Sequence, residues 1–348
     1  MPSSVPWAEA MASRWQDVVG DVPERAVILA TMAAALAPTT AESYGGHWAR
    51  FVRWCEAQPD QPNPLPASTG TVVRWLAADV TRGGKVRAGS LQPYLSAING
   101  IHRDLELEAP ALGHLLGRYR RGLAHTQGKA GRTAQRTYLP APVVESMHLW
   151  ALELNLKAAS RAQLSAFRAA VCTIFTFAFF ARGATGAALL ASHVRRSVAG
   201  ITVTFEHEKG KAKNWDSRTI TIAPGAISGL EELLDKWEAF RGDVKGTRSY
   251  YLLPGERARG AFPSTQVDQW LREILDHLGV TPPPGELWSG HSLRKGAASG
   301  AAAVAVQLVK ICFVGGWAVA SKAVHDYVDP TCPASAAARR YFGWLLPS

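Results

Sequence analysis

Nearly every apolar pattern in this 348-residue chain has the period of an α-helix, and only one place has the period of a β-strand. Trp48, Phe51 and Trp54 follow the spacing i, i+3, i+6, which puts them on one face of a helix. The exception is a pair of alternating β-branched runs, 201–205 and 218–222, around a polar loop, which indicates a hairpin. The sequence therefore predicts a mainly α fold with a small β component.

The helical pattern is interrupted once by a long stretch of linker composition. This stretch is rich in Gly, Lys, Gln and Thr, contains no acidic residue, and ends at two closely spaced prolines. A chain of this length also suggests two domains. We therefore predict a loosely ordered N-terminus at 1–23, a helical domain at 24–124, a basic linker at 125–142 and a mixed α/β domain at 143–348.

Caps and breaks give the expected helices. In the first domain we expect helices over 24–36, from Thr39/Thr40 through Cys55, from Ser68 or Thr69 to Leu76, from Ser90 to Ile101, and from Leu112 to Leu123. In the second domain we expect helices near 143–156, 163–181, 225–240, 264–278, 292–304, 305–314, 320–327 and 335–345.

The chain carries 38 Lys and Arg against 28 Asp and Glu, a net charge of +10. Such an excess favours a polyanionic partner, of which nucleic acid is the commonest, although many basic proteins bind nothing anionic. The basic residues gather in a glycine-containing loop and toward the linker, where they either contact nucleic acid or belong to a solvated tether. The candidate DNA-binding residues are Arg82, Lys85, Arg87, Arg118, Arg120, Arg121, Lys129 and Arg132.

The cysteines point to a reduced compartment. Cys55, Cys172, Cys312 and Cys332 are far apart and form no C-x-x-C pair, so we expect free thiols of an intracellular protein and neither disulfides nor a zinc site. The longest apolar runs are too short to span a bilayer, so we expect no membrane partner. No Walker pattern or metal-ligand set is visible, and we expect no cofactor.

The residues best suited to chemistry lie in the last third of the chain. His291 and Arg294 are three residues apart, on one helix face, and together can bind a phosphate. Trp317 follows 23 residues after this arginine, and Tyr327 follows 33 residues after it. A tyrosine hydroxyl near a bound phosphate can attack the phosphorus. Taken singly, each residue has an ordinary structural explanation, such as a surface pair or a core aromatic.

Taken together and in order, three segments resemble the C-terminal signature of the tyrosine recombinases, the superfamily of phage integrases and transposon-encoded recombinases. They read His-Ser-Leu-Arg-Lys-Gly-Ala-Ala-Ser, Gly-Gly-Trp and Tyr-Val-Asp-Pro. The amino-acid sequences of these segments are most similar to those of recombinases from DIRS or Crypton mobile elements of eukaryotes. The resemblance covers residues 24 to about 347. It implies an all-helical core-binding (SAM-like) domain followed by a mixed α/β catalytic domain.

The resemblance implies DNA strand exchange through a 3′-phosphotyrosyl link, without ATP or a metal. Tyr327 is then the nucleophile, His291 the base, and Trp317 a hydrogen-bond donor or packing group. Arg294 and Arg182 hold the phosphate oxygens.

Two positions of the family pattern need comment. Arg182 follows the apolar run that ends at Ala181, as the family's first catalytic arginine does, but Thr185 stands where the family usually has an acid. The family's lysine lies in the hairpin, where this chain offers three. We assign Lys209 as the general acid, with Lys211 as the alternative and as a DNA-binding residue.

The resemblance also implies the partners: double-stranded DNA, and a homo-tetramer on two duplexes. The amphipathic stretch Ser335–Leu346 would dock on a neighbouring protomer; packing on its own domain is the alternative. Tyr341 is a rival nucleophile, which we reject because it lies 47 residues after Arg294. Location in the nucleus follows if the host is eukaryotic.

Three other functions stay open at this point. A type IB topoisomerase uses the same chemistry without exchanging partners. A non-catalytic DNA-binding descendant fits the departure at Thr185. A basic protein with no DNA role would show no salt-dependent affinity for DNA.

Overall fold

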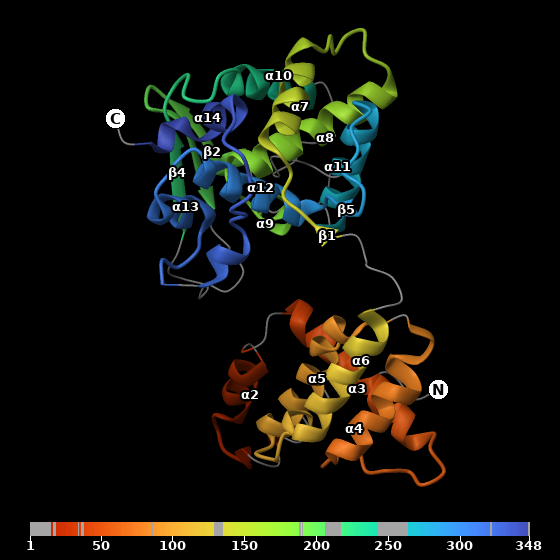
Figure 1. Ribbon diagram of the computed structural model, residues 1–348. Coiled ribbons are helices and arrows are strands. Elements are labelled where there is room, and N and C mark those ends of the chain that lie inside the picture. The colour runs from red at the N-terminus through yellow and green to blue at the C-terminus, as the bar shows by residue number, and fades with distance from the viewer. Residues whose placement is uncertain are drawn as a thin grey trace. The chain divides into compact units, whose positions relative to one another are not determined.

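The computed structural model describes residues 15–16, 19–33, 35, 38–84, 86–128, 135–187, 189, 191–205, 217–242, 264–320 and 322–346. The chain divides into two compact units, residues 1–132 and 133–348 (Figure 1). Each unit has a hydrophobic core of its own. Within the described residues, no helix combines the length and apolar character that crossing a membrane requires.

All regular secondary structure in the described residues of unit 1 is helical. Its elements are α2 (Arg25–Ala33), α3 (Pro38–Glu56), α4 (Thr69–Trp75), the π-helix η1 (Leu76–Val80), the 3₁₀ turns η2 (Arg82–Gly84) and η3 (Ala88–Ser90), α5 (Gln92–Asp104), the 3₁₀ turn η4 (Pro110–Leu112) and α6 (His114–Gly128). The predicted helices are confirmed. Ser68 caps α4 by accepting a hydrogen bond from the Thr71 N–H.

Two details of the prediction for this unit are wrong. Helix α6 continues to Gly128, so the first residues of the predicted linker at 125–142 are helical. Trp15, within the N-terminus predicted to be loose, is buried in the core of unit 1. An indole supplies enough apolar area to hold a segment that has no periodic pattern of its own. Most of the remaining predicted N-terminal segment lies outside the described residues.

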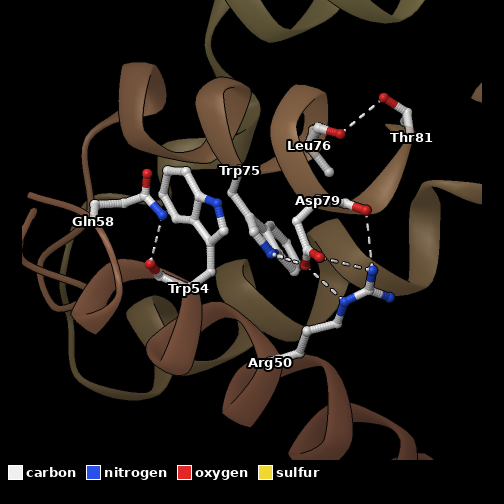
Figure 2. A network of polar contacts seen from close by, with 7 residues as sticks. All are labelled: Arg50, Trp54, Gln58, Trp75, Leu76, Asp79 and Thr81. Atoms are coloured by element: carbon white, nitrogen blue, oxygen red, sulfur yellow. Dashed lines mark hydrogen bonds and ion pairs between the residues drawn. The ribbon is translucent and has the colours of Figure 1, made fainter. Parts of the chain in front are cut away.

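A polar network ties α3 to the π-helix in unit 1 (Figure 2). The Arg50 guanidinium donates to both carboxylate oxygens of Asp79, at 2.7 and 3.2 Å, and to its backbone carbonyl. The buried Trp75 indole N–H donates to the same carboxylate at 3.0 Å. Thr81 closes the π-helix by donating its N–H and its hydroxyl to the Leu76 carbonyl. The network therefore fixes the backbone from which the basic loop at Arg82 departs.

Replacing Asp79 by alanine is expected to destabilise unit 1 by about 1–3 kcal/mol, because a buried indole N–H loses its acceptor. The matched control is Asp60→Ala. Asp60 also binds an arginine, Arg74, through both oxygens, but both side chains are half exposed. Its loss should leave the free energy of unfolding nearly unchanged, because solvent screens an exposed ion pair. Urea unfolding of the full chain measures both changes, and equal losses would contradict a structural role for the network.

Unit 2 combines helices with two small sheets. Its elements are β1 (Gln135–Arg136), α7 (Ala141–Glu153), α8 (Arg161–Ala178), α9 (Gly183–Ala187), η5 (Ala191–His193), β2 (Val194–Ser197), β3 (Gly200–Phe205), β4 (Arg218–Ile222), α10 (Leu230–Gly242), α11 (Ser264–His277), β5 (Glu286–Leu287), α12 (Gly290–Ala303), α13 (Leu308–Gly315), η6 (Lys322–Asp326), α14 (Ala336–Phe342) and η7 (Gly343–Leu345). Helix α8 is buried over most of its length, with α7, α11 and α12 packed against it.

The predicted hairpin is confirmed and gains a third strand. β3 and β4 pair antiparallel, with Val203 opposite Ile220, and β2 adds to the other edge of β3 (Figure 1). β2 was not predicted because three of its four residues are exposed, so it lacks a buried alternating face. The two-residue parallel pair β1–β5, which sets Arg136 opposite Leu287, was also missed because it is too short to show a period.

The C-terminal segment packs on its own unit, which corrects the prediction that Ser335–Leu346 docks on a neighbouring protomer. α14 contacts α12 and α7, and Tyr341, Phe342 and Leu345 are buried in the core of unit 2. The Tyr341 hydroxyl and His148 Nδ1 are hydrogen-bonded at 2.9 Å. The apolar surface that motivated the docking prediction is therefore already covered by unit 2 itself, and we do not propose α14 as an interface between protomers.

Candidate active site

Helix α12 presents His291 and Arg294 one turn apart. The helix begins at Gly290, whose N–H donates to the Asp268 carboxylate of α11 at 2.5 Å. A carboxylate at this position satisfies one of the free N–H groups of the first turn and complements the helix dipole. The His291 side chain is accessible to solvent, whereas Arg294 is completely buried. One helix thus carries an accessible imidazole above a buried guanidinium.

Arg294 joins three parts of unit 2. Its Nη1 donates to the Phe180 carbonyl at the end of α8, and its Nη2 donates to the Gly315 carbonyl of α13. The guanidinium carbon lies 3.7 Å from the ring centre of Trp317 and 5.3 Å from that of Tyr327. A cation held against two aromatic faces is stabilised by their quadrupoles. Arg294 therefore has a structural role in addition to any contact with an anion.

Arg182 lies in the short connection between α8 and α9, as the sequence predicted. Phe180, two residues earlier, has a left-handed backbone with φ +53°, which turns the chain sharply before the arginine. The Arg182 side chain is half-buried, and its Nη1 is buried without a hydrogen-bond partner among the described residues. A buried guanidinium nitrogen without a partner is costly unless an anion binds there. Thr185 is buried one turn later, in α9.

Trp317 is held by the end of α13. Gly316 has φ +66° and ends this helix, with hydrogen bonds from the Gly316 and Trp317 N–H groups to the Phe313 and Cys312 carbonyls. A Cβ on Gly315 would overlap the Trp317 ring, so only glycine allows the indole to lie where it does. The Trp317 side chain is mostly buried, and its N–H has no partner among the described residues.

Tyr327 follows η6 and completes the cluster. Its half-buried ring lies 5.1 Å from the Trp317 ring and 6.5 Å from the His291 ring, measured between ring centres. The structure thus brings Arg182, His291, Arg294, Trp317 and Tyr327 together from four separate segments of unit 2.

The His291 imidazole is surrounded by charge. Its partial burial lowers its pKa below the ordinary value, and Arg136, Arg294 and Arg182 lower it further, while Asp268 acts in the opposite direction. His291 is therefore neutral at pH 7 and can accept a proton. Arg136 and Asp268 were not predicted as site residues. The pairing of β1 with β5 places Arg136 near His291, and no residue spacing in the sequence predicts that contact.

The other predicted site residues divide into two groups. Arg87, Arg118 and Arg121 are exposed on unit 1, as is Arg82, and Arg120 is half-buried. Arg120 and Arg121 line a cleft of about 410 Å³ with Ala88, Gly89, Gly117 and Ala124. Lys85, Lys129, Arg132, Lys209 and Lys211 lie outside the described residues.

The loop beside this cleft is tied to α6 by one amide side chain. Gln127 accepts a hydrogen bond from the Ala88 N–H at 2.9 Å and donates one to the Val86 carbonyl at 3.1 Å. The two bonds hold the backbone on either side of Arg87. Gln127 thus ties the backbone around Arg87 to α6, the helix that carries Arg120 and Arg121.

Replacing Arg294 by alanine is expected to destabilise unit 2 by about 3 kcal/mol or more, because two buried carbonyls lose charged donors and the core gains a void. Arg272→Ala, on the exposed side of α11, is the control and should change stability by less than about 0.5 kcal/mol. Thermal unfolding compares the two variants. Equal stability of both would contradict the structural role of Arg294.

No model of a known protein family matches the sequence, and no curated protein matches it. Solved structures do match. The XerH site-specific recombinase bound to palindromic difH substrate in a post-cleavage complex has a TM-score of 0.59 at 11% identity, over 94% of both chains. A lambda integrase tetramer bound to a Holliday junction has a TM-score of 0.52 at 16% identity, over 84% of this chain and 72% of that one.

A third match is the Tn1549 transposon integrase in complex with transposon right end DNA, with a TM-score of 0.53 at 8% identity over 95% of this chain and 96% of that one. At sequence identities this low, the matches show a shared fold and nothing finer. A helical unit followed by a mainly helical unit with a three-stranded antiparallel sheet is thus the fold that this chain shares with these recombinase and integrase structures.

Proposed function

We propose that this chain is a site-specific DNA recombinase that cleaves and rejoins DNA through a 3′-phosphotyrosyl intermediate. The observation that carries the proposal is the convergence of one phenol, one imidazole and two guanidinium groups at one place in unit 2. The fold it shares with recombinases and integrases supports the proposal.

In the proposed cleavage step, the Tyr327 hydroxyl oxygen attacks the scissile phosphorus and forms a P–O bond, while the bond from phosphorus to the 5′-oxygen breaks. His291 takes the phenol proton, and Lys209 gives a proton to the leaving 5′-oxygen. Attack by another 5′-hydroxyl then reverses the step and completes strand exchange. The covalent link retains the phosphodiester bond energy, so the reaction needs no ATP.

The charge that develops on the phosphate oxygens requires cationic donors. Arg182 offers a buried Nη1 that has no partner within the described residues. Arg294 lies beneath the Trp317 and Tyr327 rings and already binds two carbonyls. We propose that these two rings shift when DNA binds, so that Arg294 can reach the phosphate. The unpartnered Trp317 N–H is then a third donor.

Unit 1 supplies the proposed non-catalytic contacts with double-stranded DNA. Arg120 and Arg121 line the cleft between η3 and α6, and Arg82, Arg87 and Arg118 are exposed on the same unit. Contacts of arginines with phosphates set affinity without reading sequence. We extend this proposal to Lys85, Lys129, Arg132 and Lys211, and we propose a homo-tetramer on two duplexes as the assembly. From the residues of the three motifs, we propose that a DIRS- or Crypton-like mobile element encodes the chain.

The test of the proposed function uses the full chain and a nicked duplex. The nick lets a short 5′-hydroxyl strand diffuse away after cleavage, so that a covalent species accumulates and appears on a denaturing gel. Element-end sequences provide the candidate substrates. We expect a protein–DNA adduct that a protease shortens and that contains Tyr327 by peptide mass spectrometry. Salt-dependent binding without any adduct would favour the DNA-binding descendant. Plasmid relaxation without recombinant product would favour the topoisomerase.

The rate of cleavage is expected to fall at acidic pH, because His291 must be neutral to accept the proton. Its lowered pKa puts this fall below its ordinary titration range. Arg136→Gln removes a nearby cation, so it should raise the pKa and move the fall to higher pH. Asp268→Asn should move it to lower pH. Single-turnover cleavage at constant ionic strength measures the profiles. Shifts of both variants in the same direction would exclude His291 as the titrating base.

A further inference from the structure

We propose that Ser299, assisted by Lys295, is a positioning residue: from helix α12 it holds the backbone segment that carries the Tyr327 nucleophile. The inference rests on the proposed function and concerns residues that the family motif does not assign to the chemistry. It arises from a bridge between α12 and the segment that carries the tyrosine.

The Ser299 hydroxyl makes two hydrogen bonds to that segment. Its Oγ donates to the Tyr327 carbonyl at 3.1 Å and accepts from the Asp329 N–H at 2.9 Å. The Ser299 side chain is completely buried. The segment after η6 is neither helix nor strand, so its backbone groups need partners from elsewhere. One hydroxyl thus satisfies the backbone on both sides of Val328.

Lys295 reinforces the same connection one turn earlier on the helix. Its ammonium lies 3.3 Å from the Asp329 carboxylate, and both side chains are mostly removed from solvent. The other carboxylate oxygen accepts hydrogen bonds from the Thr331 N–H and hydroxyl. Bonds to the Thr331 hydroxyl and to Lys295 both lower the pKa of Asp329, which stays ionised and keeps the ion pair.

The consequence is that a single helix sets the distance between the nucleophile and the phosphate-binding group. Arg294, Lys295 and Ser299 are all on α12, within two turns. Loss of the bridge frees the backbone at Tyr327 without touching the guanidinium. Since displacing a reacting group by about 1 Å can cost about 100-fold in rate, a fall of this order is expected when the bridge is broken.

The first test is Ser299→Ala in the full chain, measured as single-turnover formation of the phosphotyrosyl adduct. We expect the rate to fall about 10- to 100-fold with unchanged affinity for DNA. Ser299→Thr, which keeps the hydroxyl, should recover most of the rate. Ser335→Ala is the matched control, because the Ser335 hydroxyl also accepts a backbone hydrogen bond, but from the Ala338 N–H at the start of α14 and not from the segment that carries Tyr327. It should leave the rate unchanged.

The second test separates positioning of the nucleophile from general damage to the site. In a Tyr327→Phe background, hydrogen peroxide replaces the phenol: a peroxide oxygen bonds to phosphorus, and the 5′-oxygen leaves with a proton. We expect Ser299→Ala to leave this peroxide-dependent cleavage unchanged, because it does not use the bridge. If Ser299→Ala lowers both reactions equally, the residue is merely structural and the inference is overturned.

Where Ser299→Ala does not fold, Asp329→Asn breaks the ion pair nearer the surface and is measured in the same two ways. Unchanged adduct formation in a folded Ser299→Ala or Asp329→Asn variant overturns the inference while the proposed function stands. Failure of the unmodified chain to form any adduct overturns the proposed function instead. The two failures are therefore distinguishable.

Discussion

Replacing Tyr327 by phenylalanine is expected to abolish the covalent protein–DNA adduct completely, while DNA binding and stability are kept. Only the hydroxyl is lost, and it is the atom that must bond to phosphorus. The ring keeps its contacts with Trp317 and Arg294, and the backbone keeps its hydrogen bond to Ser299. The measurement is the denaturing gel with nicked DNA, together with a binding assay under the same salt conditions.

The control is Tyr341→Phe, which removes a hydroxyl from another tyrosine of unit 2. Tyr341 is completely buried and bonds to His148, and burial raises its pKa far above the ordinary value, so it cannot supply a phenolate to DNA. This variant should lose about 1–3 kcal/mol of stability and still form the adduct. An adduct that survives Tyr327→Phe but not Tyr341→Phe would refute the assignment of the nucleophile.

Arg182→Ala is expected to lower the rate of cleavage by about 10²- to 10³-fold, equivalent to about 3–4 kcal/mol of transition-state stabilisation. The reason is that one nitrogen of its guanidinium has no hydrogen-bond partner within the described part of unit 2. In the proposed mechanism this nitrogen donates to a phosphate oxygen. Because the substitution leaves no hydrogen-bond acceptor unpaired at that nitrogen within the described residues, we expect stability to change little. Single-turnover cleavage and thermal unfolding measure the two quantities.

Arg195→Ala is the matched control for this variant, because it removes the same charge from unit 2 at an exposed position on β2. It should change DNA affinity and its salt dependence only slightly, and leave the rate of the bound complex unchanged. A similar loss of rate in both variants would mean that net charge, not a specific contact at Arg182, accounts for the effect.

The sequence predicts some classes of secondary-structure element and misses others. The helices were predictable because Trp48, Phe51 and similar residues repeat with a helical period, which depends only on neighbours along the chain. The β3–β4 hairpin was predictable for the same local reason. β2 and the β1–β5 pair were not, since an exposed strand and a two-residue strand leave no period to read.

The candidate site shows the same division. The order and spacing of His291, Arg294, Trp317 and Tyr327 are local facts, and they were enough to suggest phosphate chemistry. That Arg294 is buried under two rings, and that Arg136 and Asp268 flank His291, were not visible. Such contacts join separate segments of the chain; Arg136 and His291, for example, are more than a hundred residues apart.

By itself, the sequence determined the helical character of the chain, the position of its hairpin and the set of side chains capable of the proposed chemistry. Only the tertiary structure decided what each apolar face packs against, and α14 is the clearest case: its amphipathic pattern fits a neighbouring molecule and its own domain equally well. The physical reason is that periodicity specifies that a face is buried, whereas the partner that buries it depends on packing between distant segments.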